Sequence, residues 1–177
     1  TGRVKQQLDK AGIAYRPAGA HGLALDNATK LDALGAPDQD YVVQDISSQA
    51  TASFFPDRSA LPAKPLVWDA CAGSGGKSIM TMDILPAARL HVSDLRPSIL
   101  QNLRQRFRHA GIRSEQMAVI DLTQAADASH REFFPAKGFD LVIADVPCTG
   151  SGTWGRDPWM LAAFDPASLD RYARRQK

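Results

Sequence analysis

The sequence predicts an α/β fold, with a parallel β-sheet flanked by helices and a small, partial α+β region in front of it. From about Leu66 onward, short apolar runs alternate with helical segments, and four of the runs end in an aspartate. A glycine-rich turn follows the first run. Alternation of this kind requires crossover connections, which give a parallel sheet with helices on both faces. Because ligands of such sheets bind beyond the carboxyl ends of the strands, we expect the functional site there.

The expected strands cover residues 66–69, 89–94, 117–121 and 139–145. The last of them is apolar enough to be buried on both faces. Helices are expected over 76–84 and 97–110. Pro97 suits the first turn of a helix, and Gly111 suits a left-handed cap at its end.

The first 60 residues follow a different pattern. We expect a helix over 4–11, two short extended pieces between 15 and 25, a brief strand over 41–44 and a helix over 47–55. Three prolines then mark a linker, namely Pro56, Pro62 and Pro65. This part is too small to hold a core alone, so we divide the chain into a partial N-terminal region (1–60) and a second domain (61–177).

The composition is that of an ordinary soluble globular protein, with 44% hydrophobic and 23% charged residues among 177. No apolar stretch approaches the roughly 18 residues of a membrane span, so we expect no membrane contact. Two cysteines 77 positions apart make neither a disulfide framework nor a zinc site, which favours a cytoplasmic protein without metal. The net charge of +2 is weak, and the sequence leaves the oligomeric state open, with a monomer as the simplest expectation. Arginine clusters indicate solvated helix faces or phosphate contacts: Arg104, Arg106, Arg108 and Arg113, and Arg171, Arg174 and Arg175.

Four aspartates mark the ends of the expected strands: Asp69, Asp94, Asp121 and Asp145. Asp94 lies 25 residues after Asp69, about the distance at which nucleotide-binding sheets place a ribose carboxylate. One such acid is usually a turn residue or a helix cap. Four in register favour a shared pocket.

The glycine-rich turn, residues 70–78, nearly matches two phosphate-binding loops. A P-loop needs glycine where Cys71 stands, and a dinucleotide loop needs glycine where Ser78 stands. S-adenosylmethionine fits instead, because it has a ribose and an adenine but no phosphate. Its carboxylate would lie near Lys77 and the start of the helix.

The segment Asp145-Val146-Pro147-Cys148 carries a cysteine where amino-group methyltransferases carry an aromatic residue. A thiolate beside a nucleobase indicates carbon chemistry, because its addition to carbon 6 of cytosine makes carbon 5 nucleophilic. The carboxyl group of Asp145 could hold or protonate the ring nitrogen. Alternatively, Cys148 is an inert small residue in a tight turn.

Three segments in this order, 43–49 (VQDISSQ), 69–78 (DACAGSGGKS) and 145–152 (DVPCTGSG), closely resemble RNA cytosine-C5 methyltransferases of the bacterial small-subunit rRNA type and their nucleolar relatives. The resemblance implies a Rossmann-like methyltransferase sheet, S-adenosylmethionine as cofactor, and cytosine in RNA, with rRNA first, as substrate. It also implies that residues 1–60 are part of an RNA-binding region with a linker, and that residues 61–177 are an S-adenosylmethionine-binding methyltransferase domain that stops before its last strands. It puts Asp94 on the ribose, Asp121 near the adenine, and Asp145 between cofactor and base. The expected residues around the cofactor are Cys71, Ala72, Gly73, Ser74, Gly75, Gly76 and Lys77.

Two departures from the family pattern matter. Gly73 and Ser74 replace alanine and proline, a mild change because backbone groups do most of the binding. The cysteine that matches Cys148 assists product release in the family, whereas the covalent nucleophile follows a later strand. We therefore expect that nucleophile beyond Lys177, and the sequence to be a piece of a longer protein. One alternative is a non-catalytic RNA-binding module of the same fold. The other is a P-loop-like nucleotide-binding protein, which is disfavoured because Cys71 stands where a P-loop needs glycine.

Overall fold

The computed structural model describes residues 2–19, 22–26, 28–31, 34–124, 130–155 and 157–176. The N-terminal elements are α1 (Gly2–Lys10), β1 (Tyr15–Ala18), β2 (Gly22–Leu25), α2 (Ile46–Ala50) and the 3₁₀ helices η2 (Thr51–Phe54) and η3 (Arg58–Ala60). The remaining elements are β3 (Leu66–Asp69), α3 (Gly76–Ile84), β4 (Arg89–Asp94), α4 (Pro97–Ala110), β5 (Gln116–Val119), β6 (Leu141–Ile143), η5 (Ser151–Thr153), α5 (Pro158–Ala162) and α6 (Ala167–Arg175).

The predicted parallel sheet is confirmed, with strand order β5-β4-β3-β6. β3 pairs in parallel with β4 and with β6, and the register sets Asp69 opposite Val92 on one side and Ile143 on the other. β4 pairs with β5 so that Asp94 stands opposite Val119. The carboxyl ends of all these strands therefore meet at one edge of the sheet.

One face of the sheet packs on α3 and α4, which contribute buried side chains to the same core as the strands. Leu90 and Val92, two positions apart on β4, point to the same face because side chains alternate along a strand. They form a buried core with Ile79 of α3 and with Leu103 and Phe107 of α4. The predicted bounds of both helices are confirmed, and Gly111 caps α4 in the left-handed conformation.

The other face of the sheet is covered by aromatic rings rather than by a helix, as far as the described residues show. Trp68 of β3 packs 5.3 Å from the ring of Phe134 and 5.3 Å from that of Phe139. The ring of His91 on β4 lies 5.1 Å from the ring of Phe133, and its Nδ1 donates a hydrogen bond to the Phe133 carbonyl oxygen at 2.9 Å. The expectation of helices on both faces is therefore wrong for the described part, because this segment between β5 and β6 buries its rings directly on the strands.

β6 is shorter and more exposed than the expected strand over 139–145. Val142 is 46% exposed, so burial on both faces is also wrong. Among the described strands β6 pairs only with β3, which leaves its outer edge unpaired. The third expected strand, over 117–121, is confirmed with bounds shifted to Gln116–Val119.

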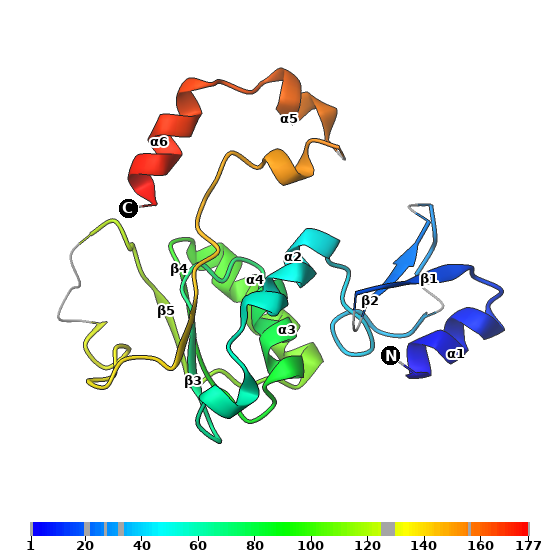
Figure 1. The fold of residues 1–177 in the computed structure, drawn as a ribbon, viewed down its shortest axis with the longest axis horizontal. Coiled ribbons are helices and arrows are strands. Elements are labelled where there is room, and N and C mark those ends of the chain that lie inside the picture. Colours follow the sequence, from blue (N-terminus) through cyan, green and yellow to red (C-terminus); the bar gives the residue numbers. More distant parts are fainter. Residues whose placement is uncertain are drawn as a thin grey trace.

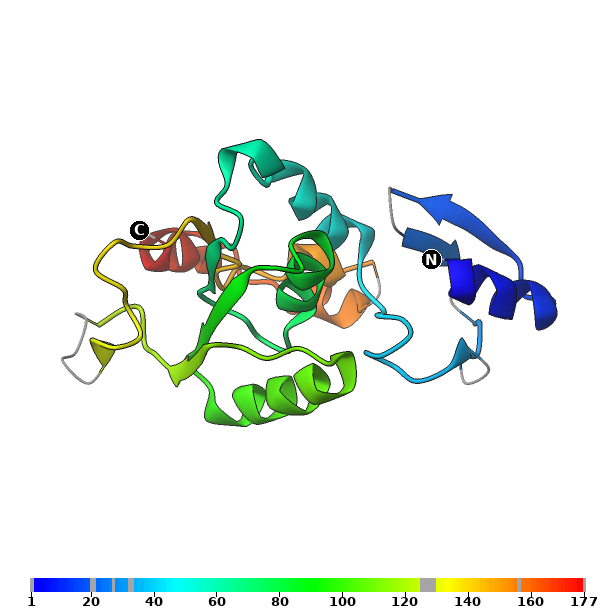
Figure 2. The same cartoon turned by 90° about the horizontal axis from the view of Figure 1, so that it is seen from below.

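The N-terminal elements α1, β1 and β2 lie at one end of the molecule, away from the sheet (Figure 2). The expected helix over 4–11 and the two extended pieces are confirmed as α1 and the antiparallel pair β1 and β2. The strand expected over 41–44 is wrong: Tyr41 forms an isolated bridge with Pro37, inside a tight turn. The helix expected over 47–55 is split into α2 and η2, because the chain tightens into a 3₁₀ turn before Pro56.

Beyond β6 the chain carries α5 and α6 along the carboxyl edge of the sheet (Figure 1). The side chain of Gln176 donates a hydrogen bond to the carbonyl oxygen of Pro147 at 2.8 Å, which ties the end of α6 to the segment after β6. None of the described helices has the length and apolar character needed to cross a membrane.

We predict that Leu103→Ala lowers the free energy of unfolding by about 2–5 kcal/mol, since Leu103 is fully buried between α4 and the sheet. Urea denaturation followed by circular dichroism measures the loss. Asn102→Ala, at an exposed neighbouring position, is the matched control and should change stability by less than about 0.5 kcal/mol. Equal effects of the two substitutions would contradict the placement of α4 on the sheet.

Candidate functional site

The glycine-rich loop leaves the end of β3 and turns directly into α3. The Ala72 amide donates to the carbonyl oxygen of Ser93 at 2.9 Å, and the Gly75 amide donates to that of Ala72 at 2.8 Å. Gly75 has φ +86°, and a Cβ added to it would collide with the side chain of Leu103. A glycine is therefore required at this position, where the loop rests directly on α4.

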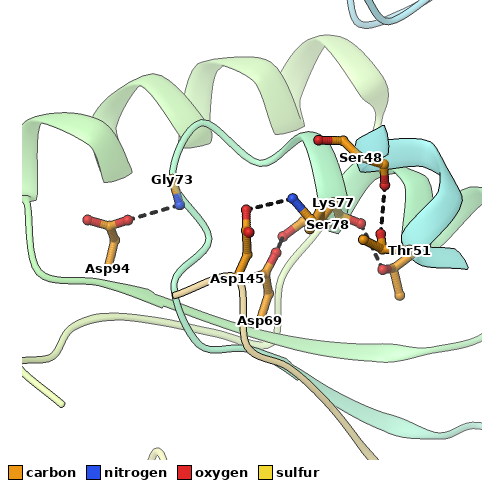
Figure 3. A network of polar contacts seen from close by, with 9 residues as sticks. Ser48, Thr51, Asp69, Gly73, Lys77, Ser78, Asp94 and Asp145 are labelled. Atoms are coloured by element: carbon orange, nitrogen blue, oxygen red, sulfur yellow. Dashed lines mark hydrogen bonds and ion pairs between the residues drawn. The ribbon is translucent and has the colours of Figure 1, made fainter. Parts of the chain in front are cut away.

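The first of the three sequence segments lies against this loop. A Cβ added to Gly76 would lie 3.6 Å from the side-chain nitrogen of Gln44. Gln49 in turn donates to the carbonyl oxygen of Gln44 at 3.3 Å. Figure 3 shows Ser48 and Thr51 beside the start of α3, where Lys77 and Ser78 lie. The fold thus brings together segments 43–49 and 69–78, which the sequence identifies separately.

Asp94 ends β4 and faces the loop (Figure 3). Its carboxylate accepts a hydrogen bond from the Gly73 amide at 2.9 Å. It also accepts from the Arg96 amide at 3.0 Å and from the Arg96 guanidinium at 3.0 and 3.2 Å. Burial acts to raise the pKa of Asp94, but the hydrogen bonds from Arg96 and Gly73 outweigh it and hold the pKa below its ordinary value. The carboxylate is therefore charged, and its most exposed partner is the Arg96 side chain, which is 62% exposed.

Asp69 is the site residue that the sequence reasoning did not select, although it was recognised as a strand-ending acid. It is fully buried under the loop, and one carboxylate oxygen accepts from the Ser78 hydroxyl at 2.6 Å. The other oxygen, Oδ1, has no hydrogen-bond partner among the described residues. Burial raises the pKa of Asp69 to about 6, against the opposing hydrogen bond from Ser78. Its position immediately before the loop was the available signal.

Asp145 lies two residues beyond β6, and Lys77 reaches it from the first turn of α3. The two side chains form an ion pair with an N–O distance of 2.6 Å (Figure 3). The Lys77 side chain is only 14% exposed, whereas that of Asp145 is 55% exposed. This pair joins the second and third sequence segments at the sheet edge.

The two cysteines have different surroundings. Cys71 is half-buried, and burial, followed by the charges of Asp94 and Asp69, raises the pKa of its thiol. Cys148 is exposed on the segment after β6, and its sulfur accepts a hydrogen bond from the Gly150 amide at 3.4 Å. An exposed thiol with an amide donor is the more accessible of the two for chemistry.

Asp121 lies at the same edge of the sheet but is engaged locally. Its carboxylate accepts from the amide of Thr123 at 2.9 Å and from the hydroxyl of Thr123 at 2.7 Å. These hydrogen bonds lower its pKa, and the charge of Arg175 acts in the same direction. The carboxylate of Asp121 is therefore occupied by its own turn, and the charge that α6 brings near it is that of Arg175.

Three carboxylates each bond to a residue of the loop: Asp69 to Ser78, Asp94 to Gly73 and Asp145 to Lys77. The cations that pair with them are Lys77 and Arg96. Within the described residues, no cluster of histidine, cysteine and acidic side chains could hold a metal ion. Three carboxylates against two cations leave one excess negative charge, which favours a ligand of net positive charge over the loop.

We predict that Asp69→Asn removes a pH dependence from stability. The pKa of Asp69 rises from an ordinary 3.8 to about 6 on folding, so the folded state holds its proton more tightly. The contribution of Asp69 to wild-type stability should fall as pH rises from 4 to 6, by up to about 3 kcal/mol, and stay lowered above that range. Urea denaturation at a series of pH values should show the variant gaining stability relative to the wild type over this interval. Parallel pH profiles would contradict the prediction.

Comparison with known proteins gives the chain a family. Residues 60–177 match the family model described as 16S rRNA methyltransferase RsmB/F. Ribosomal RNA small subunit methyltransferase B of Xanthomonas campestris pv. campestris is 31% identical over 158 residues, which cover 88% of this chain and 34% of the relative. The chain thus spans about a third of the length of the curated relatives that it matches.

Solved structures share the fold. The crystal structure of PH0851 has a TM-score of 0.79 and 21% identity, covering 98% of this chain and 38% of that one. NSun6 from Pyrococcus horikoshii, solved with SFG, has a TM-score of 0.61 and 18% identity, covering 87% of this chain and 36% of that one. With the family-model match over more than half of the sequence, the chain belongs to the RsmB/F family of 16S rRNA methyltransferases.

Proposed function

We propose that this chain is the cofactor-binding part of an enzyme that transfers a methyl group from S-adenosylmethionine to carbon 5 of cytosine in RNA, with 16S rRNA as the expected substrate. Family membership supports the reaction class. The single observation that carries the choice of cofactor is the group of three carboxylates that bond to residues of the glycine-rich loop.

The residues present fit S-adenosylmethionine better than a phosphate ligand. That cofactor carries a sulfonium and an ammonium against one carboxylate, so its net charge suits a site rich in Asp69, Asp94 and Asp145. A triphosphate would instead add several negative charges to a site that already has one in excess. The start of α3, which none of the described side chains caps, offers amide donors for the single carboxylate. The P-loop-like alternative is therefore disfavoured.

Each site residue has a role in this proposal. Asp94 binds the ribose hydroxyl groups, and Asp121 lies near the adenine. The backbone of the loop surrounds the amino-acid part of the cofactor through residues Cys71, Ala72, Gly73, Ser74, Gly75, Gly76 and Lys77. Lys77 also holds Asp145, with which it pairs at 2.6 Å, between the cofactor and the target base.

The bound cofactor supplies an electrophilic methyl group. In the proposed reaction a cysteine thiolate bonds to carbon 6 of cytosine, and the displaced electron pair makes carbon 5 nucleophilic toward that methyl group. A proton acceptor then removes the proton from carbon 5, which allows the carbon–sulfur bond to break. We assign the attack to a second cysteine outside residues 1–177 and the release step to Cys148. Asp145 holds the ring of the base.

We predict that Asp94→Ala weakens S-adenosylmethionine binding by about 1–3 kcal/mol, since the ribose hydroxyl groups lose their acceptor. Arg96→Ala should act in the opposite direction. The Arg96 guanidinium now holds the carboxylate oxygens that the ribose needs, so its removal lowers the cost of entry. Isothermal titration calorimetry on both variants measures the two effects.

Arg113→Ala, which removes an arginine just beyond α4, controls for the loss of positive charge alone. Unchanged affinity in Asp94→Ala would show that the ribose binds elsewhere. Weaker binding in Arg96→Ala would show that this arginine contacts the cofactor directly instead of giving way to it.

We predict that Cys148→Ala traps the enzyme on its RNA, when measured in a form of the protein extended to the length of its relatives. Without the releasing thiol, addition and methylation still occur, but elimination stalls. Denaturing gel electrophoresis with labelled RNA should show a slowly migrating protein–RNA species. Cys71→Ala is the matched control and should not give this species.

Two other outcomes would each correct the assignment. Loss of methylation without a trapped species would make Cys148 the attacking nucleophile. Normal turnover would make it a structural residue of the turn between Pro147 and Gly150.

A further inference from the structure

Arg106 on α4 joins two segments that are distant in the sequence. Its guanidinium holds both carboxylate oxygens of Asp38, with the shortest N–O distance at 2.6 Å. Another nitrogen of the same group donates to the Ser74 carbonyl oxygen at 2.6 Å and reaches the Ser74 hydroxyl at 3.3 Å. The planar guanidinium suits such a fork, because it fixes several hydrogen bonds at once.

The turn that carries Asp38 is built to present this carboxylate. Asp38 has φ +66°, the one positive φ of a non-glycine residue among those described. The turn is closed by a hydrogen bond from the Asp38 amide to the Tyr41 carbonyl oxygen at 2.8 Å. A second one runs from the Ala36 amide to the Asp40 carboxylate at 2.9 Å. Backbone strain of this kind persists only where its surroundings hold it in place.

The same turn is tied to the N-terminal helix, since Arg3 of α1 pairs with Asp40 at 3.3 Å. Between the turn and α4 lies an open hollow lined by Pro37, Gln39, Gln105 and His109 together with the ion pair. The junction is therefore not closely packed there, and the Asp38–Arg106 pair is its principal polar link. Both partners are largely shielded from solvent, with side chains 14% and 23% exposed.

We propose that Arg106 is a positioning residue that sets the shape of the glycine-rich loop. Through Asp38, that shape then depends on the N-terminal region. The inference rests on the proposed function for its consequence, cofactor affinity, but the mechanical link stands on the contacts alone. Arg106 acts from outside the loop, on the Ser74 carbonyl oxygen, and does not need to touch the cofactor.

The loop needs such an anchor because it is rich in glycine. Gly73 and Gly75 both have positive φ, which glycine adopts without steric cost, so contacts from outside the loop contribute to fixing its shape. The Gly73 amide must point at Asp94, and the Gly75 amide at the carbonyl oxygen of Ala72. The Ser74 carbonyl and the Gly75 amide belong to one peptide group, so a fixed Ser74 carbonyl sets the orientation of the Gly75 amide directly. The Gly73 amide is separated from this peptide group by the backbone torsions of two residues only, so the same anchor restrains it as well. A displacement of the N-terminal turn would thereby reach the ribose-binding end of the loop.

The test uses Asp38→Asn and Arg106→Ala, with Arg108→Ala as a charge-matched control on the exposed face of α4. Asn is chosen at position 38 because it tolerates positive φ, so the turn is kept while the ion pair is broken. Hydrogen–deuterium exchange without cofactor reports the amides of Gly73 and Gly75. Calorimetry with S-adenosylmethionine reports affinity.

We expect the loop amides to exchange about tenfold faster in both variants, while the amides of β3 and β4 keep their wild-type rates. Cofactor binding should weaken by about 5- to 50-fold in both, and the double variant should be no worse than Arg106→Ala alone. Arg106→Lys, which keeps one donor, should recover part of the affinity. A merely structural role would instead raise exchange across the sheet.

Wild-type exchange at the loop in both variants would overturn the proposal, as would additive losses in the double variant. Faster loop exchange in Arg106→Ala but not in Asp38→Asn would overturn the link to the N-terminal region. If the wild-type chain does not bind S-adenosylmethionine, the proposed function fails, and the exchange rates still decide the link.

Discussion

The glycine-rich loop can rest directly on α4 because Gly75 carries no side chain, and the rest of the site depends on that contact. Leu103 occupies the space that a Cβ at position 75 would need. The close approach sets the start of α3 at the carboxyl edge of the sheet and brings the Gly73 amide within 2.9 Å of Asp94. It also brings Ser74 within reach of Arg106. The absence of a side chain at Gly75 thus permits both the hydrogen bond between Gly73 and Asp94 and the contact between Ser74 and Arg106.

The electrostatics of the site follow from the strand register. In this parallel sheet β3 lies between β4 and β6, so the carboxyl ends of the three strands meet at one edge. The acids that follow these strands therefore lie close together. Asp69 responds by a raised pKa, since it is buried, whereas Asp145 pairs with Lys77 and Asp94 with Arg96. Three carboxylates against two paired cations leave one excess negative charge at this edge, which favours a ligand of net positive charge.

Local signals predicted the elements that local chemistry determines. Pro97 and Gly111 bound α4 as expected, and the apolar run over 89–94 is β4. Predictions failed where contacts with distant parts of the chain determine burial or strand pairing. The apolar segment 139–145 was expected to be buried on both faces, but its exposure depends on which neighbours β6 has. The segment 41–44 has strand propensity but lacks a partner strand among the described residues. No pattern in the sequence pairs Asp38 with Arg106, because the two are 68 positions apart.

The expected boundary after residue 60 stays a prediction, and the contacts of the site cross it. The family match begins at residue 60, yet Gln44 lies against Gly76, and Asp38 holds Arg106 from the N-terminal side. Residues before the boundary therefore complete the shell of the loop. If the N-terminal region also contacts RNA, as the resemblance implies, its position and the geometry of the cofactor loop share one set of hydrogen bonds. Any change that RNA binding makes to cofactor affinity through these bonds is then matched by an equal change that the cofactor makes to RNA affinity, because coupling between binding sites is reciprocal.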